Sequence, residues 1–313
     1  MRTWPSRSPT SPSSRAGRDH VTDRGVLGRW VLGARPRTLP ASVAPVVVGT
    51  AAAFGGGGIS AGRALLAAVV ALALQVGVNY ANDYSDGVKG TDANRVGPTR
   101  LVASGLASAR SVKVAAFVAF AVAAAAGAGL ALMTTPWLFV VGAAAIAAAW
   151  FYTGGPKPYG YLGLGELFVF VFFGLVATAG SCFVQHQRLT ALSLIAGAAM
   201  GCLSCALLVV NNLRDIPTDT VSGKRTLAVR LGDGHTRWFY VLLIGAAFVL
   251  VAVAAIQRPW SLLALGAVVV AVPVVRIVRA GAAGPALIAV LGGTARLQLV
   301  LGMLLAVGLI ARR

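Results

Sequence analysis

The chain has 313 residues, of which 57% are apolar and only 12% are charged, and its mean hydropathy is +0.79. A water-soluble core of this length cannot bury that much apolar surface, so the composition excludes an ordinary soluble protein and indicates a polytopic membrane protein. The net charge of +18 is spread through loops rather than gathered in one basic domain, which argues against a nucleic-acid partner and fits contact with anionic lipid.

Residues 1–29 are rich in Ser, Pro and Arg and contain no apolar stretch, so we expect a disordered basic cytoplasmic tail. Residues 30–313 are predicted to form one all-α transmembrane domain. Its apolar runs reach the roughly 17 to 25 residues that a helix needs to cross a bilayer. Nine spans are predicted in chain order, at about 39–57, 64–82, 112–133, 136–153, 163–184, 190–212, 237–256, 259–278 and 286–310.

Basic residues predict the orientation of these spans, because short cytoplasmic loops are enriched in Lys and Arg. With the N-terminus in the cytoplasm, 22 of the 27 basic residues lie on the cytoplasmic side and 5 on the other. We therefore predict an N-in topology, in which the second and sixth spans end at the cytoplasmic surface.

Acidic residues are scarce and gather at these two span ends. Five of the nine in the chain lie there, namely Asp83, Asp86, Asp92, Asp215 and Asp219. On the second span, polar residues from Gln75 to Asp86 recur at helical spacing, with Asp83 included in the stripe. Such a stripe is expected to line a cavity, because polar groups facing lipid cost several kcal/mol.

The two acidic clusters resemble each other, since Asn82 and Asp86 correspond to Asn211 and Asp215. Four predicted spans separate them, and an even number gives both halves the same orientation, so we expect a weak parallel repeat around one cavity. Mg²⁺ prefers oxygen ligands and is commonly held by one or two carboxylates plus substrate phosphates. Four basic residues of the following loops are candidates for neutralising a diphosphate, namely Lys89, Arg100, Lys224 and Arg225.

This combination predicts ionisation of an isoprenoid diphosphate whose tail lies in the bilayer. Pro217 leaves open whether the sixth span continues through both of its aspartates. Glu166 is a candidate for the acceptor site or for pairing with a basic loop residue. Three tyrosines are candidates for shielding a carbocation or for an interfacial aromatic belt, namely Tyr152, Tyr159 and Tyr161.

Several strings carry a family resemblance. They are Arg35-Pro36-x-Thr38-Leu39, the stretch 82–92, the stretch 155–166, Asn212-x-x-Asp215-x-x-x-Asp219 and the stretch 224–232. Over about residues 30–310 the chain resembles the UbiA superfamily of intramembrane aromatic prenyltransferases. Asp92 stands six residues after Asp86, a spacing similar to the 1,4-dihydroxy-2-naphthoate polyprenyltransferases of menaquinone synthesis.

The resemblance implies a nine-helix bundle around a central cavity, in a bacterial cell membrane. It implies Mg²⁺-dependent transfer of a polyprenyl chain from polyprenyl diphosphate to 1,4-dihydroxy-2-naphthoate, with loss of CO₂ and diphosphate, to give demethylmenaquinone. The implied Mg²⁺-diphosphate ligands are Asp83, Asp86, Asp92, Asp215 and Asp219. The implied substrate-binding residues are Asn82, Lys89, Arg100, Tyr159, Glu166, Asn212, Lys224 and Arg225.

Two alternatives stay open. A prenyltransferase of the same superfamily with another aromatic acceptor, such as 4-hydroxybenzoate or homogentisate, would show the same acidic clusters. A secondary transporter would also show repeats and polar stripes, but its binding site usually lies near the bilayer midplane, whereas these aspartates are predicted at the cytoplasmic rim.

Overall fold

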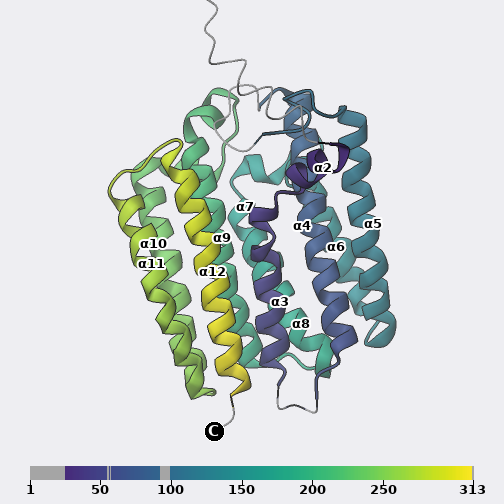
Figure 1. Cartoon of the computed structure of the whole chain (residues 1–313), viewed down its shortest axis with the longest axis vertical. Coiled ribbons are helices and arrows are strands. Elements are labelled where there is room, and N and C mark those ends of the chain that lie inside the picture. Colours follow the sequence, from purple (N-terminus) through teal and green to yellow (C-terminus); the bar gives the residue numbers. More distant parts are fainter. Residues whose placement is uncertain (1–24, 55, 57, 92–98, 312–313) are drawn as a thin grey trace, which may run out of the picture.

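The computed structural model describes residues 25–54, 56, 58–91 and 99–311, and all regular elements in these ranges are helices. Figure 1 shows them standing as one bundle, which confirms the predicted all-α membrane fold. Seven helical stretches of the described chain are long and apolar enough to cross a membrane. They are α4 (Ala61–Lys89), α5 (Ala109–Met133), the stretch Gly165–His186, α9 (Ala191–Val221), α10 (Leu227–Ala255), the stretch Pro259–Arg279 and α12 (Ala286–Ile310).

Two shorter apolar helices, α3 (Pro40–Ala52) and α6 (Trp137–Phe151), occupy the positions of the predicted first and fourth spans. At 1.5 Å per residue they extend about 20 Å and 22 Å, less than the roughly 30 Å of a hydrocarbon core. The count of nine spans therefore stays a prediction. A separate 3₁₀ turn, η1 (Pro36–Thr38), precedes α3.

Two of the long stretches change helix type along their length. The first consists of α7 (Gly165–Val169), the π-helical segment η3 (Phe170–Val176) and α8 (Ala177–His186). The second consists of the 3₁₀ segment η4 (Pro259–Ala267) and α11 (Val268–Arg279). At η3 the chain touches α9 backbone to backbone, since a Cβ on Gly174 would lie 2.5 Å from the Cα of Gly201.

α9 is the most enclosed span, with 72% of its apolar window buried. It begins with a capping box in which Thr190 and Ser193 each accept from the other's backbone N–H. It then continues through Pro217 to Val221, so Asp215 and Asp219 lie one turn apart on one helix. Pro217 lacks a backbone N–H, so one intrahelical hydrogen bond is missing near the C-terminal end of α9.

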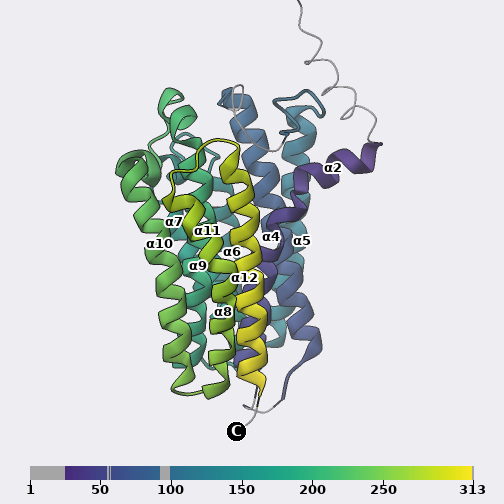
Figure 2. The same ribbon diagram turned by 60° about the vertical axis from the view of Figure 1, so that its left-hand side comes forward.

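The described aspartates of the two acidic clusters lie at the same end of the bundle. α4 and α9 both terminate there, and α2 (Val26–Ala34) lies at the same end, opposite the C-terminus (Figure 1). α4 ends at Gly90, whose φ of +71° is the left-handed conformation typical of a glycine that closes a helix. Figure 2 shows α2 running outward from the bundle. The predicted tail boundary at residue 29 falls inside α2, and residues 1–24 lie outside the described ranges.

Gly49 brings α3 against α8, because a Cβ at this position would lie 2.0 Å from the carbonyl oxygen of Thr178. We expect Gly49→Ala to destabilise the fold by about 1–3 kcal/mol through overpacking, seen as a lower midpoint of thermal unfolding in detergent. The matched control is Gly142→Ala on α6, where nothing lies within 4 Å of the added Cβ. Equal midpoints for the two variants would contradict this packing.

Candidate active site

A cavity of about 370 Å³ is enclosed by α3, α4, α6, α9 and the stretch from α7 to α8. Polar side chains line it near the ends of α4 and α9. Apolar side chains line most of the rest, including Leu74, Phe168, Phe172, Val176 and Leu207. Such a cavity suits a ligand with a charged head and a long hydrocarbon tail.

One face of α4 supplies a polar stripe to this cavity, as the periodicity predicted. Its members are Gln75, Asn79, Asn82 and Asp86. Asn79 donates to the carbonyl oxygen of Ala34 at 2.9 Å, and Asn82 accepts from the Thr153 hydroxyl at 2.8 Å. These bonds fix the orientation of the two amides, of which Asn79 is buried.

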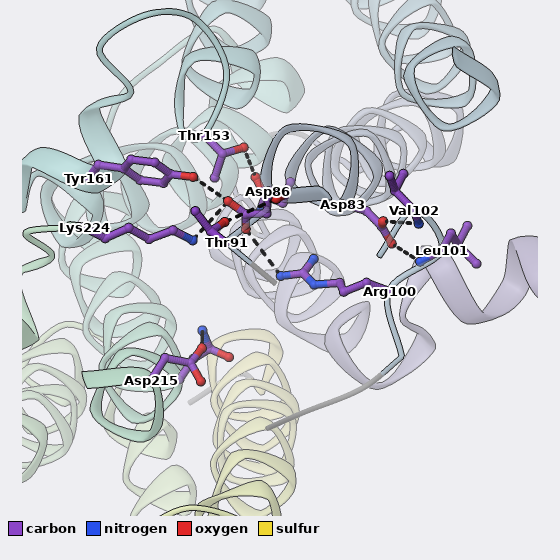
Figure 3. Close-up of polar contacts among 12 residues, drawn as sticks. Asp83, Asp86, Thr91, Arg100, Leu101, Val102, Thr153, Tyr161, Asp215 and Lys224 are labelled. Carbon is purple, nitrogen blue, oxygen red and sulfur yellow. Dashed lines mark hydrogen bonds and ion pairs between the residues drawn. The ribbon is translucent and has the colours of Figure 1, made fainter. Parts of the chain in front are cut away.

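Asp86 is the centre of the polar end, as Figure 3 shows. Its Oδ1 accepts from the Tyr161 hydroxyl at 2.5 Å and from the Lys224 ammonium at 3.0 Å. Its Oδ2 lies 3.7 Å from a guanidinium nitrogen of Arg100. The Asp86 side chain is only 6% exposed, and these partners offset the cost of burying its carboxylate. The structure thus brings the predicted residues Arg100 and Lys224 to Asp86.

Asp215 has its own cationic partner. The Arg214 guanidinium donates to Oδ1 at 2.7 Å and to Oδ2 at 2.8 Å, and it also donates to the side-chain amide oxygen of Asn211 at 2.8 Å. Asp215, Asn211 and Asp219 all line the cavity with Asp86. Figure 3 shows Asp215 apart from the cluster around Asp86. Sequence reasoning assigned Arg214 only to membrane topology, because adjacent helical residues do not normally share a face.

Asp83 departs from the predicted stripe. It is 1% exposed and is not among the cavity-lining residues. Its two oxygens accept from the backbone N–H groups of Leu101 at 2.8 Å and Val102 at 3.0 Å. Successive residues of an α-helix are turned by about 100°, which puts Asp83 at the edge of the stripe rather than at its centre.

Three further predicted residues, Lys89, Arg225 and Glu166, also lie outside the lining. The Lys89 ammonium donates to the Thr153 carbonyl oxygen at 2.8 Å, and Arg225 is exposed. Glu166 is buried and accepts from the lining residue Asn212 at 3.0 Å. Asp92 lies outside the residues that the structure describes.

Aromatic rings form one wall of the cavity. Tyr159, in the 3₁₀ turn η2 (Tyr159–Leu162), stacks on Phe168 with ring centroids 4.0 Å apart. Its hydroxyl donates to the Ala148 carbonyl oxygen at 2.8 Å. Burial raises the pKa of Tyr159 above its ordinary value, so the phenol keeps its proton at neutral pH. Tyr161 was predicted only as an aromatic ring, whereas its hydroxyl contacts Asp86.

The donor chemistry of the polar end fits Mg²⁺. Among the described residues, no three His, Cys, Asp or Glu side chains cluster closely enough to hold a metal by themselves. The cavity does offer carboxylate oxygens from Asp86, Asp215 and Asp219 and amide oxygens beside them. Mg²⁺ commonly takes one or two carboxylates and completes its shell with water and substrate phosphates.

Comparisons with known proteins agree with the resemblance found in the sequence. Residues 42–285 match the UbiA prenyltransferase family. The chain is 53% identical over 274 residues to a 1,4-dihydroxy-2-naphthoate octaprenyltransferase of Mycobacterium tuberculosis (strain ATCC 25618 / H37Rv), covering 88% of this chain and 94% of that protein. It is 38% identical over 230 residues to the protein of the same name from Escherichia coli (strain K12), covering 71% and 75%.

A solved structure shares the fold. A UbiA homolog from Archaeoglobus fulgidus bound to GPP and Mg²⁺ superposes with a TM-score of 0.63 at 13% identity, over 88% of this chain and 99% of that one. The family match spans most of the helical bundle, including α4, α9 and the cavity between them. The chain is thus a prenyltransferase that belongs to the UbiA prenyltransferase family.

Proposed function

We propose that this protein transfers a polyprenyl chain from polyprenyl diphosphate to 1,4-dihydroxy-2-naphthoate in menaquinone synthesis, with Mg²⁺ and with release of diphosphate and CO₂. The observation that carries the proposal is the cavity itself, in which Asp86 and Asp215, from two different helices, line one polar end of an otherwise apolar space. The names of relatives up to 53% identical support the choice of acceptor.

The diphosphate head binds at the polar end. Asp86, Asp215 and Asp219, supported by Asn82 and Asn212, are the residues that hold Mg²⁺. When bound, Mg²⁺ supplies positive charge that stabilises the departing diphosphate. Arg100 and Lys224, which contact Asp86 in this structure, turn to phosphate oxygens when the donor arrives and so release the carboxylate.

The reaction breaks the allylic C–O bond, whose electron pair leaves with the diphosphate. The ring carbon that carries the carboxylate attacks the allylic cation and forms the new C–C bond. Loss of CO₂ then returns its electron pair to the ring and leaves demethylmenaquinone in its reduced, quinol form. The stacked rings of Tyr159 and Phe168 place aromatic π-electrons near the developing cation, and protonated Tyr159 is a weaker nucleophile toward it than a phenolate would be.

We place the polar end of the cavity at the cytoplasmic surface of a bacterial plasma membrane. The positive-inside distribution of Lys and Arg supports this orientation. So does the position of α2 at the end where α4 and α9 terminate (Figure 1). The diphosphate would thus enter from the aqueous side while its isoprenoid chain lies among the apolar lining residues.

The direct test incubates membranes carrying the protein with a labelled long-chain polyprenyl diphosphate and 1,4-dihydroxy-2-naphthoate, with Mg²⁺ or with EDTA. We expect a prenylated naphthoquinol with Mg²⁺ and none with EDTA. A parallel reaction contains 4-hydroxybenzoate. Product from that acceptor alone would overturn the acceptor assignment, and no product from either, in folded protein, would overturn prenyl transfer.

Removing charge from the metal-binding pair should abolish most activity. We expect Asp86→Asn and Asp215→Asn each to lower kcat/KM by about a hundredfold or more, because each variant would hold less firmly the Mg²⁺ that stabilises the leaving group. The control is Asp233→Asn, since the Asp233 side chain is 60% exposed and pairs with Arg237 outside the cavity. Near-normal turnover by either cavity variant would contradict the assignment.

The apolar part of the cavity should select donors by chain length. Gly180 of α8 lines the cavity, and nothing lies within 4 Å of a Cβ added there. We expect Gly180→Leu to raise the KM of a long-chain donor about tenfold while leaving geranyl diphosphate nearly unaffected. Gly245→Leu is the control, because Gly245 is exposed on α10 outside the cavity. Equal effects on both donors would show that the chain does not reach Gly180.

A further inference from the structure

We propose that Asp83 is a positioning residue that holds Arg100 in the active site, and that it is not a ligand of the metal. The inference rests on the proposed function, because it assigns Arg100 to the donor's diphosphate. It also assigns Asp83 a role other than the metal binding that the sequence motif predicted.

Both oxygens of the Asp83 carboxylate bind the backbone. Each oxygen accepts one backbone N–H, from Leu101 at 2.8 Å and from Val102 at 3.0 Å, as Figure 3 shows. The residue is 1% exposed and does not line the cavity. A ligand of Mg²⁺ must present an oxygen to the space that the ion and the phosphates occupy, and Asp83 presents both oxygens to the chain instead.

The chain segment that Asp83 binds begins next to Arg100, whose side chain reaches the active site. Arg100 directly precedes Leu101, and its carbonyl oxygen accepts the Ser104 hydroxyl at 2.5 Å, which closes the chain into a turn. From this turn the Arg100 guanidinium extends to 3.7 Å from Asp86. Asp83 and Asp86 lie about one turn apart on α4, so one rigid helix fixes both the anchor and the target of Arg100.

Packing holds the same segment against α4. Leu101 is fully buried, and a Cβ on Gly33 of α2 would lie 2.6 Å from its side chain. Val102 crosses α4 at Gly87, where an added Cβ would lie 2.6 Å from the Cβ of Val102. Two glycines therefore permit the close approach that the Asp83 hydrogen bonds require. This arrangement removes much of the entropy that a loop arginine would otherwise lose on binding phosphate.

The first test compares Asp83→Asn with Gly87→Ala. Asparagine offers one acceptor oxygen and turns an amide N–H toward a backbone donor, whereas the alanine Cβ pushes Val102 away without removing any carboxylate. We expect both variants to raise the KM of the polyprenyl diphosphate tenfold to a hundredfold, on the order of effects seen for residues that orient a ligand-binding group. Measured at saturating donor, the Mg²⁺ concentration for half-maximal activity should not change, because the proposal leaves the metal ligands intact. Gly62→Ala, in the first turn of α4 with only the Ser60 hydroxyl near the added Cβ, is the matched control.

A double-mutant cycle tests whether Asp83 acts through Arg100. In an Arg100→Gln background, Asp83→Asn should change kcat/KM by less than about twofold, because the residue it positions is already gone. If Asp83 were a metal ligand, its loss would multiply the loss caused by Arg100→Gln. It would also raise the Mg²⁺ requirement, and Gly87→Ala would behave as wild type.

Limited trypsin digestion supplies a measurement that needs no activity. The Arg100–Leu101 bond is protected while Leu101 is buried and its N–H is bonded to Asp83. We expect cleavage there to be about tenfold faster in Asp83→Asn and Gly87→Ala, with unchanged cleavage after the exposed Arg188. Unchanged cleavage and unchanged KM in both variants would overturn the proposal. If the wild-type protein transfers no prenyl group to any acceptor, the proposed function fails, while the digestion still reports on the anchor.

Discussion

The buried carboxylate of Asp86 is the interaction on which the rest of the site depends. A charge that is 6% exposed is costly to hold in a membrane protein, and Asp86 is held by Tyr161, Lys224 and Arg100. These partners come from three segments far apart in sequence. Their contacts with one carboxylate hold the three segments together at the end of the bundle. The same requirement places two cations where a diphosphate would bind.

The same cations also affect how the polar end binds a metal. Asp86 pairs with Lys224 and Arg100, and Asp215 pairs with Arg214, so neither carboxylate offers uncompensated negative charge. A divalent cation would gain little there until a donor brings its own phosphate charge. Binding of metal and donor is therefore expected to be strongly coupled, which also protects the allylic diphosphate from ionising before the site is complete.

The helical periodicity of the sequence predicted the helices and the polar face of α4. The apolar runs became helices, and Gln75, Asn79, Asn82 and Asp86 lie along one face because helical spacing dictates it. The contacts of Asp83 with Leu101 and Val102 depend instead on where the turn after Arg100 packs against α4. Residue spacing along the sequence does not predict that packing. The bidentate pair of Arg214 and Asp215 was missed for a related reason, since neighbours on a helix rarely meet. The role of Tyr161 as a donor to Asp86 required the fold of the segment after α6.

The central claim, that donor and metal complete one site between Asp86 and Asp215, is tested most directly by Mn²⁺ binding. Electron paramagnetic resonance would follow Mn²⁺ titrated into the purified protein with and without a non-reactive thiodiphosphate analogue of the donor. We predict tight binding only with the analogue, and its loss in Asp86→Asn and in Asp215→Asn. Equally tight binding without the analogue, or binding unaffected by either substitution, would contradict the account.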